Sequence, residues 1–227
     1  MDANRGKALI STDEMKEVNY VVDEIQESKF ISHYFNNNSN LYQVDIRWEL
    51  GNLLCKSLLD ILEIDYDKQT LRVIDLKTTG QSLNHFVRNL LKFGYLTQVA
   101  FYTLAVEYWK DNIETQFKEF KVLPPQFIVC ETTDKFNNSP RIFSVTESDL
   151  QQAIHGGVIR GRWHKGVYEL AELYNWHREN NEWSYPKHLC ESKGVQVIED
   201  LFDTNHKSYT YEEKEISLNV PFQGRDP

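Results

Sequence analysis

Two apolar stretches joined by a short polar turn constrain the fold of this chain more than any other feature. Residues 53–63 and 70–77 are rich in the residue types that favour strands, and the Asp-Tyr-Asp-Lys-Gln turn at residues 65–69 predicts a hairpin. Because side chains alternate along a strand, Asp75 and Lys77 should lie on the same face of the sheet. A carboxylate and an ammonium at the end of an apolar strand carry a desolvation cost, which is offset if they hold a cation and a phosphate between them.

The rest of the chain shows helical and strand patterns in turn. Ser11, followed three residues later by Glu14, predicts a capping box at the start of a helix. Gly51-Asn52 predicts a tight turn, so that three short strands form an antiparallel meander. The predicted helices are 12–29, 83–93, 95–110 after a break at Gly94, and 147–178, and the predicted strands are 42–50, 53–63, 70–77, 126–132 after Pro124-Pro125, and 141–145. Glycines at 156, 157, 161 and 166 leave open a break in the last helix.

This order of elements indicates an α/β fold. The expected architecture is a three-layer-like sandwich with a central mixed β-sheet, an antiparallel meander plus further strands, flanked by helices. A single domain is predicted over residues 1–204, because 227 residues with 41% hydrophobic and 26% charged side chains suit one globular core. Residues 205–227 contain few large apolar side chains and are predicted to form a loosely ordered tail.

Bulk composition excludes several classes of protein. No apolar run approaches the ~20 residues that a membrane span requires, and the N-terminus lacks the apolar core of a secretory signal, so we expect a cytoplasmic protein. The three cysteines, at 55, 130 and 190, are too few to hold an iron–sulfur cluster through four thiolates and argue against a disulfide framework. The net charge of −9 argues against a protein that coats DNA through its overall electrostatic field. It does not argue against a protein that binds DNA in a channel lined locally by basic residues.

Five polar residues stand in an order that resembles a family of nucleases. Asp60 lies on the first strand of the predicted hairpin, Asp75 and Lys77 lie on the second, and Gln98 and Tyr102 share one face of the next long helix. This set is similar to the PD-(D/E)XK nuclease superfamily, with its restriction-endonuclease-like core. Within that superfamily it resembles the phage recombination exonucleases of the lambda-exonuclease and RecE type. The resemblance is carried by motifs over residues 42–110 and, more loosely, by element order to about residue 178.

The resemblance implies a site that hydrolyses phosphodiesters with Mg²⁺ or Mn²⁺. Asp60, Asp75 and the main-chain carbonyl of Leu76 would bind the ion, which suits a hard cation that prefers oxygen ligands. Lys77 would orient the attacking water or help to deprotonate it. Gln98 would contact Lys77 or a phosphate, and Tyr102 a phosphate, both as hydrogen-bond donors. Asp65 and Asp67 are alternatives to Asp60 as the first aspartate of the motif. Because both lie in the turn, a structural role is favoured for them.

Candidate contacts to the DNA backbone flank these residues. Thr78 and Thr79 follow the second strand, where hydroxyl and N–H groups could hold a phosphate, and an ordinary strand end is the alternative. Arg88 and Lys92 lie one helical turn apart. A second basic cluster contains Arg160, Arg162 and Lys165. Solvated surface charge is the alternative for both clusters.

One departure from the family concerns a ligand. Its members have a further His or Glu on a helix well upstream of the first strand Asp, and here only Glu17 and Glu24 lie on the available helix, without a motif around them. The ligand is therefore absent, supplied by another segment or chain, or replaced by one of these two glutamates.

Three functions remain open from the sequence. The first is a divalent-metal-dependent exonuclease acting on linear duplex ends in phage-type recombination or DNA repair, encoded by a bacterium or phage. By the resemblance, it would form a ring of three or four subunits and work with a single-strand annealing protein. The second is an endonuclease of restriction or repair type. The third is a catalytically inactive DNA-binding or assembly module with the same fold.

Overall fold

A five-stranded mixed sheet forms the centre of the molecule. The structure is a computed structural model that describes residues 10–136 and 139–195. The strands follow each other in the order in which they occur in the chain: β1 (Leu41–Leu50), β2 (Leu53–Asp65), β3 (Thr70–Thr79), β4 (Lys121–Glu131) and β5 (Arg141–Ser144). The β1–β2, β2–β3 and β4–β5 pairs are antiparallel and the β3–β4 pair is parallel. The predicted meander and mixed sheet are confirmed.

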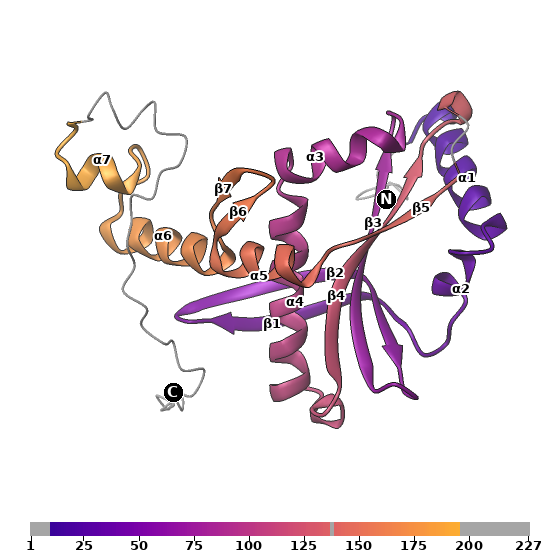
Figure 1. The fold of residues 1–227 in the computed structure, drawn as a ribbon, viewed down its shortest axis with the longest axis horizontal. Coiled ribbons are helices and arrows are strands. Elements are labelled where there is room, and N and C mark those ends of the chain that lie inside the picture. The colour runs from indigo at the N-terminus through magenta and orange to yellow at the C-terminus, as the bar shows by residue number, and fades with distance from the viewer. Residues whose placement is uncertain (1–9, 137–138, 196–227) are drawn as a thin grey trace, which may run out of the picture.

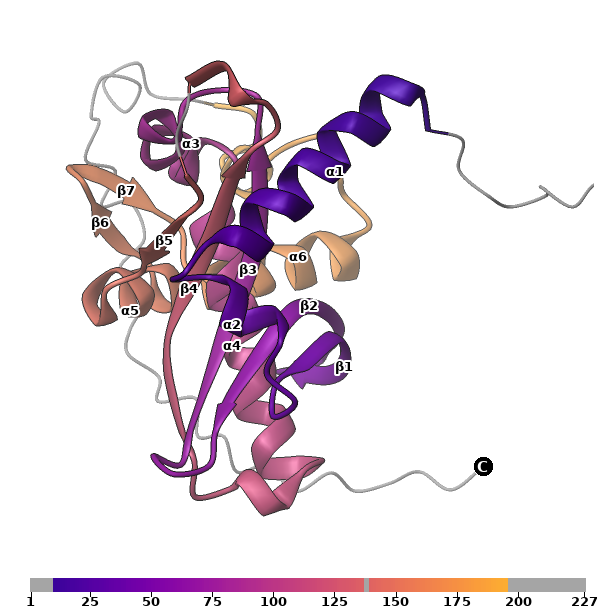
Figure 2. The same cartoon turned by 90° about the vertical axis from the view of Figure 1, so that its right-hand side faces the viewer.

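Helices cover both faces of the sheet, as Figures 1 and 2 show. One face carries α1 (Thr12–Glu27) and α2 (Ser32–Phe35), and the other carries α4 (Tyr95–Asn112), which packs across β1 to β4. The remaining helices are α3 (Phe86–Lys92), α5 (Glu147–His155), α6 (Val167–Asn180) and α7 (Lys187–Glu191), with 3₁₀ turns at Leu83–His85, Thr115–Phe117 and Asp134–Phe136. The predicted α/β sandwich is therefore confirmed. No helix in the described ranges has both the length and the apolar character needed to cross a membrane.

Strand alternation places the two faces of β3 as the sequence predicts. Leu71 and Val73 belong to the core under α4, whereas Ile74 and Leu76 contact the smaller core under α1. By the same alternation, Asp75 and Lys77 lie on the face of Leu71 and Val73, which α4 covers. The candidate site is consequently built on the face that α4 covers.

The capping box at the start of α1 is confirmed. The backbone N–H of Glu14 donates to the Ser11 hydroxyl at 3.2 Å, and the backbone N–H of Ser11 donates to the Glu14 carboxylate at 2.6 Å. These bonds satisfy two of the N–H groups that a helix start leaves without intrahelical partners. The helix ends at Glu27, two residues before the predicted end.

Strand β4 begins earlier than predicted. It starts at Lys121, so Pro124 and Pro125 lie inside it, although proline cannot donate to a ladder. In the register, Leu123 pairs with Arg72 and Gln126 with Ile74, so the two prolines face Val73 alone. The bulge keeps the two prolines out of the regular ladder with β3, so the strand continues through them.

The predicted helix over residues 147–178 is wrong. It is divided into α5 and α6 by a small hairpin of β6 (Gly157–Ile159) and β7 (Arg162–His164). Gly156 has φ 90°, and the hairpin turns at Arg160 and Gly161 with φ of 52° and 75°. Backbone at these angles cannot belong to a right-handed helix. The predicted tail, residues 205–227, lies outside the described residues.

Candidate active site

Strands β2 and β3 separate at the position of the two candidate carboxylates. The last pair of their ladder is Ile61 with Ile74, whereas β2 stays paired with β1 to Leu53 and β3 stays paired with β4 to Thr79. Asp60 and Asp75 are the next residues on the two strands. Figure 1 shows the β1–β2 hairpin leaving the sheet while β3 and β4 continue together. The two carboxylates therefore lie where the sheet opens.

Asp75 is buried beside an ammonium group. It is 2% exposed, and its carboxylate forms an ion pair with the Nζ of Lys77, two residues along the same strand face. Burial raises the pKa of Asp75, the Lys77 ammonium opposes this rise, and the charge of Asp60 adds to it. A carboxylate with these neighbours gains from a cation that replaces the hydration lost on folding.

Asp60 is held by two hydrogen bonds at the edge of the opening. Its Oδ2 accepts from the backbone N–H of Leu76 at 2.9 Å, and its Oδ1 accepts from Nε2 of Gln43 at 3.2 Å. The N–H and C=O of one strand residue point to the same edge. The carbonyl of Leu76 therefore also points toward the opening, where the sequence resemblance requires a main-chain ligand.

Gln98 and Tyr102 lie on the first half of α4. Nε2 of Gln98 donates to the Tyr102 hydroxyl at 3.0 Å, so the predicted shared helix face is confirmed. In the described residues the structure gives no direct hydrogen bond from this pair to Lys77 or Asp75. Gln98 also borders an apolar cavity of about 560 Å³ between the tip of the β1–β2 hairpin, α4 and α6.

A ring that the sequence reasoning missed lies over the lysine. Nζ of Lys77 is 4.9 Å from the centroid of the Tyr95 ring, a distance at which a cation is attracted to the ring face. Tyr95 begins α4 immediately after Gly94, whose φ is 68°. No motif marked this tyrosine, because the contact depends on how α4 crosses β3.

A second residue that was missed is Glu131, the last residue of β4. It is 1% exposed, pairs in the ladder with Thr79, and its Oε1 accepts from the backbone N–H of Leu83 at 3.0 Å. The bond ties the loop after Lys77 to the neighbouring strand. The available signal was an acidic residue at the end of an apolar strand, the same signal that marked Asp75.

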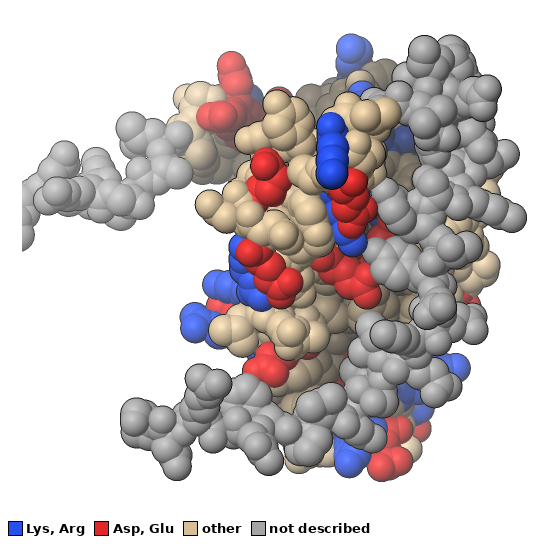
Figure 3. Space-filling view, turned by 90° about the vertical axis from the view of Figure 1, so that its left-hand side faces the viewer, with Lys and Arg blue, Asp and Glu red and all other residues tan. Residues whose placement is uncertain are grey.

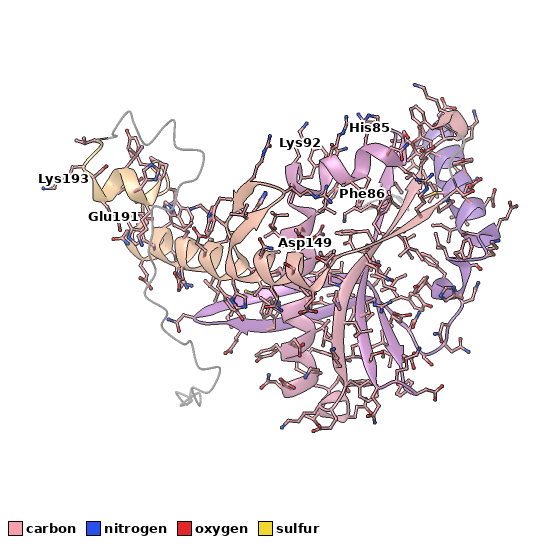
Figure 4. All side chains as sticks on the ribbon, in the orientation of Figure 1. His85, Phe86, Lys92, Asp149, Glu191 and Lys193 are labelled. Carbon is pink, nitrogen blue, oxygen red and sulfur yellow. The ribbon has the colours of Figure 1, made fainter. Side chains whose placement is uncertain are left out.

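The candidate backbone contacts lie around the edge of this site. Thr78 is exposed, and the Thr79 hydroxyl accepts from the backbone N–H of Gln81 at 3.1 Å, which is typical of a turn at a strand end. Arg88 and Lys92 are exposed on α3. Figure 4 shows Lys92 at the outer end of this helix, whereas Phe86 is buried beneath its start.

The upstream glutamates lie away from these carboxylates. Glu17 is exposed, and Glu24 is close enough to Cys130 for its charge to contribute to the raised pKa of that thiol. Cys130 shares a face of β4 with Ile128, which packs under α1, and this is the face opposite Asp75. Both glutamates belong to α1, the helix that packs on the face of the sheet opposite Asp75.

Cys130 is expected to resist alkylation. Burial, with smaller contributions from Glu24 and Glu131, raises its pKa to about 12, so almost no thiolate forms at neutral pH. Iodoacetamide labelling of the folded chain, followed by mass spectrometry, should modify Cys130 far more slowly than the less buried Cys190. In denaturant the two thiols should react at similar rates. Equal rates in the folded chain would contradict the burial of Cys130.

The donor set fits a cation that needs few protein ligands. The described part of the chain contains no group of three or more His, Cys, Asp or Glu side chains that could hold a metal ion. Mg²⁺ is usually bound by one or two carboxylates together with water and substrate phosphate. By number and type, Asp60, Asp75 and the Leu76 carbonyl would meet that smaller requirement, whereas a closed zinc site with four protein ligands would not fit.

The fold and the site define an α/β protein with two carboxylates and a lysine at a fork in its sheet. No protein-family model matches the chain, and no curated protein matches it. A similar solved structure is that of a candidate exonuclease from Eubacterium rectale, with 21% sequence identity and a TM-score of 0.47. The match covers 81% of this chain and 61% of that protein, so the chain spans about three fifths of its length.

Proposed function

We propose that this protein is a Mg²⁺- or Mn²⁺-dependent deoxyribonuclease that hydrolyses phosphodiester bonds from the ends of linear duplex DNA. The observation that supports this most is the gathering of Asp60, Asp75 and Lys77 where β2 and β3 separate. These are the residues whose order resembles the PD-(D/E)XK nucleases. Because the ladder between β2 and β3 ends before Leu76, the backbone N–H of this residue bonds to Asp60 instead of to a ladder partner on β2.

The roles follow from the contacts of each residue. Asp60, Asp75 and the Leu76 carbonyl would hold the divalent ion, which when bound supplies activation of water and stabilisation of negative charge. Lys77 presents its ammonium next to Asp75, where it would orient the attacking water and offset charge on the scissile phosphate. The Gln98–Tyr102 pair would donate to a phosphate from the side of α4.

Attack at DNA ends is proposed because Gln98 and Tyr102 resemble the helix motif of the phage recombination exonucleases. The same resemblance supports a role in phage recombination or repair, a ring of three or four subunits, and a single-strand annealing protein as partner. Light scattering after size exclusion would test the ring, since a monomer at the concentration of the activity assay would contradict it.

A direct assay tests the reaction. The full chain with end-labelled linear duplex DNA should release nucleotides in Mg²⁺ and none in EDTA. Covalently closed circular DNA should stay intact, since it offers no end. Cutting of the closed circle would support the endonuclease instead, and the absence of cleavage of either DNA in Mg²⁺ or Mn²⁺ would contradict a nuclease.

A non-enzymatic module is the second candidate. Both oxygens of Asp60 already accept hydrogen bonds within the protein, which favours a structural role for this carboxylate. Calorimetric titration with Mn²⁺ separates the two candidates. Heat of binding that disappears in Asp75→Asn supports the nuclease, whereas no binding by the wild type supports the module.

A further inference from the structure

Two segments of this acidic chain contain no carboxylate side chains. The chain has 34 Asp and Glu residues, but residues 76–106 and 150–168 contain none. The first segment includes α3, and the second includes the β6–β7 hairpin. Their exposed cations include Arg88, Lys92, Arg160 and Arg162. Both segments therefore carry net positive charge, although the chain as a whole has a net charge of −9.

The fold brings the two segments together. Nη1 of Arg160 donates to the backbone carbonyl of Val87 at 3.5 Å, and Ile159 lines a small gap together with Leu90 and Gly94. Figures 1 and 2 both show the hairpin beside α3. We call the region formed by Arg88, Lys92, Phe93, Arg160 and Arg162 the α3–hairpin surface. By contrast, basic and acidic side chains are interspersed on the described atoms visible in Figure 3.

An exposed aromatic ring lies within this surface. Phe93 follows α3 directly and is 54% exposed, and Nζ of Lys92 is 5.3 Å from the centroid of its ring. The Phe93 and Tyr95 ring centroids are 5.7 Å apart, and the Tyr95 ring lies against Lys77. The partly buried ring of Tyr95 therefore lies between the exposed ring of Phe93 and the candidate catalytic lysine.

We propose that the α3–hairpin surface binds single-stranded DNA, with a base stacked on Phe93 and phosphates on the four cations. An exposed ring among cations is the combination that binds unpaired strands, because an unstacked base offers its flat face and its phosphates attract the basic groups. Inside a duplex the base faces are covered by neighbouring pairs. The choice of DNA as the ligand rests on the proposed nuclease function. In that function the surface would bind one separated strand of the substrate, either as it approaches Lys77 or after it has passed the site.

Fluorescence anisotropy in EDTA tests binding without cleavage. The full chain should bind a labelled oligo(dT), and Phe93→Ala should weaken binding by roughly tenfold, the loss expected for one stacked base. Binding of a blunt duplex should change much less in this variant. The double change Arg160→Gln and Arg162→Gln should make the dependence of log K on log salt shallower by about 1.4, for two lost phosphate contacts.

Phe30 provides a matched control. It is also an exposed phenylalanine that follows a lysine, with Nζ of Lys29 4.8 Å from its ring centroid, but it lies between α1 and α2 on the other face of the sheet. Phe30→Ala should leave oligo(dT) binding unchanged. Equal losses in both variants, an equal loss on duplex DNA, or no binding by the wild type would overturn the proposal. Binding by a wild type that cleaves no DNA would contradict the nuclease and leave this surface supported.

Discussion

Replacing Asp75 by asparagine is expected to lower the rate of nucleotide release by about a thousandfold. A bound metal ion supplies several kcal/mol of transition-state stabilisation, and about 4 kcal/mol corresponds to this factor. Lys77→Ala should lower the rate by about 10²- to 10⁴-fold, the range for a side chain that positions or transfers a proton. Single-turnover release from end-labelled duplex with saturating Mg²⁺ measures both losses.

Thermal unfolding in EDTA should separate the two variants. Lys77→Ala leaves the buried Asp75 without its ammonium partner, which costs up to about 3 kcal/mol in unfolding free energy. Asp75→Asn removes the charge that burial disfavours, since burial is the main cause of the raised pKa of this group. This variant should therefore be the more stable of the two.

The exposed pair in the hairpin turn offers the matched control. Asp65 and Lys68 form an ion pair of 2.6 Å between Oδ2 and Nζ, outside the strand opening. Asp65→Asn should change the rate by less than about twofold, because exposed pairs contribute little and no reacting group is near. A loss as large as that of Asp75→Asn, or full activity in both Asp75→Asn and Lys77→Ala, would show that the site is assigned to the wrong residues.

Gly166→Ala is expected to destabilise the fold by about 3 kcal/mol or more. A Cβ on Gly166 would lie 2.2 Å from the backbone nitrogen of Gly156 and 2.5 Å from the carbonyl oxygen of Ile154. These are backbone atoms at the junction of α5, the hairpin and α6, so they cannot turn aside as a flexible side chain would. Denaturant unfolding followed by circular dichroism measures the loss.

Gly80→Ala is the control for this effect. A Cβ at Gly80 would have as its nearest atom the Thr132 hydroxyl at 3.9 Å, an ordinary contact distance. Its stability should stay within about 0.5 kcal/mol of the wild type. A Gly166→Ala variant as stable as Gly80→Ala would mean that the α5–α6 junction is not packed as closely as the structure places it.

Local pattern predicts most of the central sheet. The β2–β3 hairpin follows from two apolar stretches around a polar turn, and the alternation along β3 places Asp75 and Lys77 on one face before any neighbour is known. Ser11 and Glu14 determine the start of α1 for a similarly local reason. In each case the information lies in residues a few positions apart.

Where local pattern failed, distant contacts decided the structure. The stretch after Glu147 has helical composition, but the close approach of Gly156 and Gly166 divides it into two helices and a hairpin. In the sequence, Pro124 and Pro125 suggest the start of a strand. Only the pairing with β3, in which both prolines lie opposite Val73, shows that a bulge lets β4 continue through them. Glu131 and Tyr95 join the candidate site through contacts with segments far away in the chain.

The sequence by itself determined the residue types of the site and their faces, because period-two alternation is a property of one strand. The tertiary structure decided where β2 leaves β3, and so which backbone carbonyl and carboxylates face an opening. It also joined α3 to the β6–β7 hairpin, which gathers cations from two carboxylate-free segments. Pairing registers and helix packing depend on contacts between distant residues, and no local pattern in the chain encodes them.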